Sequence, residues 1–145
     1  MYSLEPLLVQ KLKDAAIADV TDVVTLADIS LLADTTKRPP CLFVINRGLR
    51  PYVGAGQLVA QSKAQQIDTL WWVVLCVKNT AQPDSGQPAR EVAQAIMTNV
   101  REALQGEKLS PQHGPLTIYE SPAPSYTDGL AWFALGFSCR QTFIL

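Results

Sequence analysis

Apolar residues recur at helical spacing in two segments of the chain. In the first segment they lie three or four positions apart, at Leu4, Leu7, Leu8, Leu12, Ala15 and Ala16. In the second they lie at Ala89, Val92, Ala93, Ile96, Val100, Ala103 and Leu104. The first pattern predicts a helix that is capped by Ser3 and ends near Ala16. The second predicts a helix over 89–104, because Pro88 suits the first turn and Gly106 the position after the end.

Between and after these helices, the pattern is typical of strands. Residues 41–46, 57–78, 116–120 and 130–143 combine apolar, β-branched and aromatic residues with breaks at proline and glycine. The last of these alternates between two sides. Residues 52–56 are expected to form a turn. Residues 17–36 have no clear period, and only a short strand or irregular arm around 22–26 is predicted there. The order of elements predicts an α+β domain over 1–145, with a mostly antiparallel sheet of four to five strands and two helices packed on one face. A basic hairpin at about 46–64 is expected to protrude from it.

The strand that ends at residue 78 is apolar on both faces. Ile67, Trp71, Val73, Leu75 and Val77 point to one side, and Leu70, Trp72, Val74 and Cys76 point to the other. One set can meet the helices, but the other needs a cover, because large exposed apolar patches are rare on monomers. Two interpretations stay open: residues 17–36 fold over this face, or a neighbouring subunit covers it. On the second interpretation, Trp71 and Trp72 lie at an oligomer interface.

Charge is unevenly distributed although the net charge is only −1. Residues 1–35 contain two lysines and six acidic residues, whereas residues 36–63 contain five basic residues and no acidic one. Such segregation suits head-to-tail contact between identical subunits, with Arg47, Arg50 and Lys63 at the interface. Neutralisation within one chain, or a merely solvated face, would explain the same pattern. A third interpretation is that Arg47 and Arg50 face passing DNA.

No residue pattern indicates catalysis. His113 lies in a proline- and glycine-rich loop and is expected to be solvated, as are Asp68 and Asp128. Cys41, Cys76 and Cys139 each lie in an apolar run, so we interpret them as small buried residues in a reducing compartment. One histidine and scattered cysteines do not form a zinc set. We therefore expect no catalytic, cofactor-binding or metal-binding residues and no enzyme. No apolar run is long enough to cross a membrane, and the start of the chain does not resemble a secretion signal.

The order and texture of these segments resemble the tail terminator (tail completion) proteins of long-tailed bacteriophages and prophages. The resemblance rests on the opening helix, the Pro-Pro-Cys-Leu-Phe-Val-Ile entry at 39–45 and the Trp-Val-Val-Leu-Cys-Val end at 72–77. The helix over 89–104 and the segment Ser-Pro-Ala-Pro-Ser-Tyr-Thr-Asp-Gly-Leu-Ala-Trp-Phe at 121–133 complete it. It covers nearly the whole chain.

The resemblance implies a non-enzymatic virion protein that forms a homo-hexameric ring. Such a ring caps the tail tube, stops its growth and presents a surface to the head connector. Its partners are copies of itself, the tail tube protein and the connector or neck protein, and it is made in the host bacterial cytoplasm before it joins the virion tail. By position, the hairpin with Arg47, Arg50 and Lys63 would make the ring contact. The alternatives are another phage neck or head-tail joining protein, a small ligand-binding or hydrolytic α+β domain, and a DNA-binding accessory protein.

Overall fold

The computed structural model describes residues 4–26, 39–51, 64–79, 86–127 and 129–144. They form two helices, α1 (Leu4–Asp14) and α2 (Gln87–Leu104), and six strands. The strands are β1 (Val23–Leu26), β2 (Cys41–Pro51), β3 (Ala64–Lys78), β4 (Thr117–Glu120), β5 (Ser125–Thr127) and β6 (Leu130–Ile144). Their order is β1-β2-β3-β6-β4, with β5 also on β6. Every pairing is antiparallel except that of β1 with β2. The predicted α+β class and mostly antiparallel sheet are therefore confirmed, with six strands in place of four or five.

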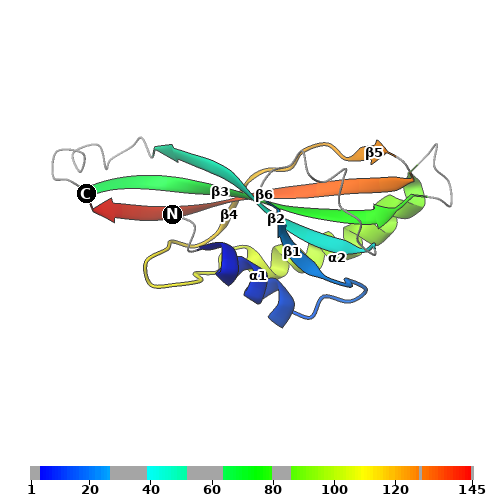
Figure 1. The fold of residues 1–145 in the computed structure, drawn as a ribbon, viewed down its shortest axis with the longest axis horizontal. Coiled ribbons are helices and arrows are strands. Elements are labelled where there is room, and N and C mark those ends of the chain that lie inside the picture. The colour runs from blue at the N-terminus through cyan, green and yellow to red at the C-terminus, as the bar shows by residue number, and fades with distance from the viewer. Residues whose placement is uncertain (1–3, 27–38, 52–63, 80–85, 128, 145) are drawn as a thin grey trace.

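Both helices pack on the same face of the sheet, as Figure 1 shows. The apolar stripe of α1 buries Leu4, Leu8 and Leu12, and the stripe of α2 buries five further residues. They meet the side chains of β3 that the sequence assigns to one face, namely Trp71, Val73, Leu75 and Val77. Burial at roughly 25 cal/mol per Å² of apolar surface makes this layer the main source of stability.

The opposite face of the sheet carries a second apolar cluster. It consists of Cys41, Phe43, Ile45, Val74 and Cys76, each at most 3% exposed in the single chain. The expectation that this face needs a neighbouring subunit as cover is therefore wrong for these five residues. The competing interpretation, a cover made by 17–36, falls largely on residues outside those described.

Beyond the helices, the sheet continues as an arm. We define the arm as residues 46–51 of β2, 64–70 of β3 and 138–144 of β6, which Figure 1 shows extending past α1 and α2 at one end of the molecule. Strand β2 thus runs five residues further than the predicted 41–46, because its second half pairs with β3. The predicted turn at 52–56 and the start of the extended segment at 57–63 lie outside the described residues.

Candidate functional site

The structure separates the five predicted interface residues. Trp71 is fully buried between the sheet and the helices, so it has no surface for a contact with another copy, and we correct that assignment. The reason is the alternation of side chains along β3, which sends Trp71 into the helix layer and Trp72 to the opposite face. Lys63 lies outside the described residues. Arg47, Arg50 and Trp72 do come together, on the face away from the helices.

Arg47 lies over the ring of Trp72. The guanidinium carbon is 4.4 Å from the ring centroid, which is a cation–π contact. A β-bulge between Asn46 and Gly48 puts Arg47 there, by changing the register of β2 on β3. Gly48 adopts a φ of 95°, and its backbone N–H donates to Oδ1 of Asn46 at 2.7 Å. Arg47 is exposed and has no ion pair among the described residues.

Trp72 also contacts the end of β4, which the sequence did not single out. Its indole Nε1 donates to Oε2 of Glu120 at 3.2 Å. The neighbouring Tyr119 lies under Arg50, whose guanidinium carbon is 5.5 Å from the ring centroid. Burial raises the pKa of Tyr119 above its ordinary value. Arg47 and Arg50 thus both lie over aromatic rings, on a surface that spans strands from β2 to β4.

Gly136 makes room for Tyr119. A Cβ atom at position 136 would come within 2.9 Å of the Tyr119 ring, closer than real Cβ contacts allow. Gly136 lies in β6 opposite Trp72. The missing side chain therefore lets Tyr119 lie across β6, close to Trp72. An isolated glycine in a strand is the one sequence signal of such a close approach.

Asp68 anchors the arm. It lies in register between Arg50 on β2 and Arg140 on β6. Its Oδ2 is 3.5 Å from Nε of Arg50, and its Oδ1 is 3.1 Å from Nε of Arg140. Asp68 is only 6% exposed, so the expectation of a solvated carboxylate is wrong: a buried charge needs partners, and the two arginines supply them. Asp128 lies outside the described residues.

His113 is buried, contrary to the expectation of a solvated loop residue. It is 4% exposed because the loop after α2 is tied to β6: the N–H of Gly114 donates to the carbonyl oxygen of Arg140 at 2.7 Å, and His113 bridges to Gln141. Nδ1 is hydrogen-bonded to the Ser110 hydroxyl, whereas Nε2 has no partner. Burial lowers the pKa of His113 below its ordinary value.

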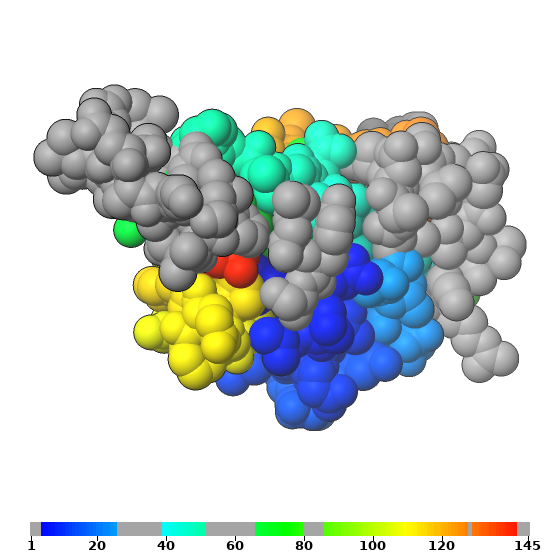
Figure 2. Space-filling model, turned by 60° about the vertical axis from the view of Figure 1, so that its left-hand side comes forward, coloured from blue at the N-terminus to red at the C-terminus, as the bar shows by residue number. Residues whose placement is uncertain are grey.

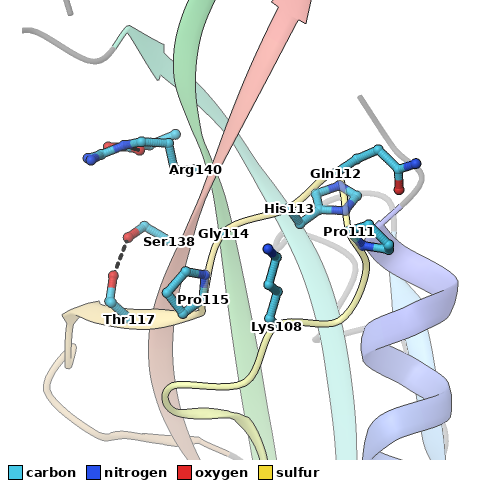
Figure 3. Close-up of a pocket in the computed structure, with 10 residues that line it drawn as sticks. Lys108, Pro111, Gln112, His113, Gly114, Pro115, Thr117, Ser138 and Arg140 are labelled. Carbon is cyan, nitrogen blue, oxygen red and sulfur yellow. Dashed lines mark hydrogen bonds and ion pairs between the residues drawn. The ribbon is translucent and has the colours of Figure 1, made fainter.

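A hollow of about 380 Å³ lies beside this loop, between it and β6 (Figure 3). Its lining includes Asp68, Lys108, His113, Thr117, Ser138 and Arg140. The polar groups are largely engaged with one another: Arg140 pairs with Asp68, and the hydroxyls of Thr117 and Ser138 lie 2.8 Å apart. Nothing in this lining pairs a nucleophile with a base. Within the described ranges, no group of three or more histidine, cysteine or acidic residues is arranged to hold a metal ion.

The three cysteines are buried, as the sequence predicts, and none of them is in a disulfide. Cys41 and Cys76 lie directly opposite each other on β2 and β3. Contact with Cys41, together with burial, raises the pKa of the Cys76 thiol, and burial raises that of Cys139 to about 11. These thiols are poor nucleophiles, since the thiolate is the reactive form. In the part of the chain that the structure describes, no helix has the length and apolar character to cross a membrane.

Comparison with known proteins gives one family. The model of the family described as "Phage tail terminator protein" matches residues 2–144. No curated protein matches the chain. The family match spans nearly the whole sequence and confirms the resemblance drawn from the order of its segments.

Proposed function

Since the chain belongs to the phage tail terminator family and is a structural protein of the phage tail, we propose that it forms a homo-oligomeric ring, a hexamer, that ends the tail tube. On this proposal, one face of the ring matches the last ring of tube protein and the other does not, so the tube stops growing. The second face then receives the head connector or neck protein. No bond is made or broken in these steps, and the protein is not an enzyme.

The observation that carries the ring proposal is the arm surface. We define the arm surface as the exposed side chains of Arg47 and Arg50 with the partly buried Trp72 and Tyr119. Arginine and aromatic residues are enriched in protein interfaces and carry much of their binding energy. An exposed cluster of this composition, on an arm that extends past the helices, supports a contact with another subunit.

The second apolar cluster does not support the proposal, because the single chain already buries it. Arg50 also serves its own chain, through Asp68. Arg47 is therefore the side chain on which the ring contact most depends. The competing role for Arg47 and Arg50 is contact with DNA that passes through the ring, which would use the same side chains in place of the subunit contact. The protein would be made in the host cytoplasm and end in the virion tail.

The proposal is tested with tail tube protein that polymerises on its own. Adding the purified chain should shorten the tubes, and electron microscopy should show one ring with a central hole at a tube end. An Arg47→Glu variant should leave tube length unchanged, whereas a control variant, Arg101→Glu on the exposed side of α2, should shorten the tubes as the unmodified chain does. Tubes that keep growing with the unmodified chain present would contradict the capping role. Rings that bind only a connector protein would favour the alternative of another neck component.

A further inference from the structure

We infer that the arm surface of one copy docks on the acidic turn of a second copy. We define the acidic turn as residues 14–22, from the last residue of α1 to the residue before β1. This inference rests on the proposed ring and adds the segment that each subunit presents to its neighbour. The argument starts from what the arm surface lacks within its own chain.

Arg47 lacks an anionic partner. Its guanidinium carbon lies over the face of Trp72, and this contact supplies no oxygen acceptor for the five N–H donors of the guanidinium. Nothing described in this chain accepts from them as an ion pair. A carboxylate is the acceptor that a guanidinium binds best, because the bonds are charge-assisted. The partner that fits this surface therefore presents exposed carboxylates.

The acidic turn has this chemistry. Asp14, Asp19 and Asp22 are all exposed, and none of them has an ion pair among the described residues. The turn is shaped by its backbone: Asp19 has a φ of 71°, and the N–H of Thr21 donates to the carbonyl oxygen of Pro40 at 2.8 Å.

A hollow of about 260 Å³ lies in the same turn. Ile17, Val20 and Ala16 give it apolar walls, and its charged lining residues are Asp22 and Lys13. An arginine side chain combines an apolar stem with a charged head, so it matches a hollow with apolar walls and a carboxylate. Elsewhere on the helix side the charges are mixed: α2 alternates Arg90 with Glu91 and Arg101 with Glu102. The acidic turn is thus the described segment that complements the arm surface.

The two surfaces lie on different sides of one molecule. In Figure 2, β2 (cyan) forms part of the upper surface, whereas α1 and the turn that follows it (blue) form the lower rim. In Figure 1, the arm extends to one end, away from the turn between α1 and β1. One copy cannot join its own two surfaces, so each copy offers its arm to one neighbour and its turn to another. Contacts of this head-to-tail kind close into rings when the rotation allows it.

Complementary charge reversal tests the inference in the full chain. One variant carries Arg47→Glu; the other carries Asp14→Arg and Asp19→Arg. Each should weaken assembly by about tenfold or more at low salt, because like charges then face each other at every contact. Mixed in equal amounts, the two variants should assemble again, since alternating copies restore an opposite-charge pair at each contact. Native mass spectrometry of the singles and the mixture gives the readout, and circular dichroism checks the fold.

The outcomes separate the inference from the proposed function. A ring that forms from unmodified chain, with no recovery in the mixture, would overturn the docking assignment and leave the ring intact. Loss of DNA retention in the Arg47→Glu variant, with an oligomer of unchanged mass, would overturn the docking assignment in favour of DNA contact. An unmodified chain that never assembles would overturn both. Should Asp19→Arg impair folding, Asp19→Asn replaces it, because asparagine tolerates the same backbone angle. A variant with both Asp19→Asn and Arg47→Gln removes two charges without reversing any, and it should weaken assembly. An unchanged assembly of this variant would count against the inference.

Discussion

At the scale of single residues, the surface proposed for assembly depends on an absent side chain. Gly136 leaves the space in which Tyr119 lies, and Tyr119 and Glu120 flank Trp72, on whose ring Arg47 rests. None of these contacts follows from the periodicity of the sequence, because they join residues that are distant in the chain. Conformational freedom of glycine is not the reason for Gly136; the close approach of another side chain is.

Replacing Gly136 by alanine should lower the free energy of unfolding by about 1–3 kcal/mol, since the added methyl group overlaps the Tyr119 ring. Urea denaturation measures the change. In a Tyr119→Ala background the same substitution should cost little or even stabilise, because alanine limits the unfolded chain more than glycine does. An equal cost in both backgrounds would show that the ring is not the source of the clash.

His113 gives a pH dependence of known sign. Burial lowers its pKa in the folded chain below the ordinary value of about 6.5. The unfolded chain therefore binds the proton first, and stability should fall as the pH drops from about 6.5 towards the folded pKa. A His113→Gln variant should lose part of this dependence between about pH 7.5 and 5.5, while the contribution of the carboxylates remains. Parallel pH profiles for the two proteins would contradict the assignment.

At the scale of elements, the arm is a three-stranded extension held by one buried carboxylate. Asp68 joins β2 and β6 through Arg50 and Arg140, where the sheet has no helix beneath it. The sequence predicts the strands of this region but not the ion pairs that join them. The carboxylate and its partners are separated by many residues, and only the register of β2 and β6 on β3 brings them together.

Asp68→Asn should loosen the arm by about 1–2 kcal/mol, a value reduced because both arginines are about half exposed. Amide hydrogen exchange should become faster at 67–70, with α2 unchanged. Glu102→Gln removes a charge of the same sign at an exposed site of α2 and serves as the control, which should leave the exchange of the arm as it is. Uniformly faster exchange throughout the sheet would mean that Asp68 supports the whole fold and not the arm alone.

How far the sequence predicts each element depends on whether the contacts that form it are local or join residues distant in the chain. The helix predicted over 89–104 ends where α2 ends, at Leu104, because a local stripe and Gly106 mark it. The sequence predicts a short strand or irregular arm around 22–26, where β1 lies, but the parallel pairing of β1 with β2 has no local signal. The sequence does not predict β5, since its three residues are all exposed and pairing with β6 alone defines it. The prediction that His113 is solvated is wrong for the same reason, because a long-range bridge to β6 buries it and loop composition gives no sign of this.

At the scale of the whole molecule, the two apolar clusters of the sheet do not require a second copy to cover them. The helices cover one face, and the cluster around Phe43 is buried on the other. What remains for assembly is a smaller surface of arginine and aromatic side chains, together with a turn of opposite charge. Contacts of this kind are screened by salt, so assembly should weaken as ionic strength rises.

The mass of the unmodified chain in solution tests the central claim most directly. Light scattering at low salt, over a range of protein concentrations that includes tens of micromolar, should give one closed oligomer, and the Arg47→Glu variant should give mainly the 15.8 kDa monomer under the same conditions. A strict monomer for the unmodified chain, or an oligomer of unchanged mass for the variant, would contradict the claim that the arm surface joins one subunit to the next.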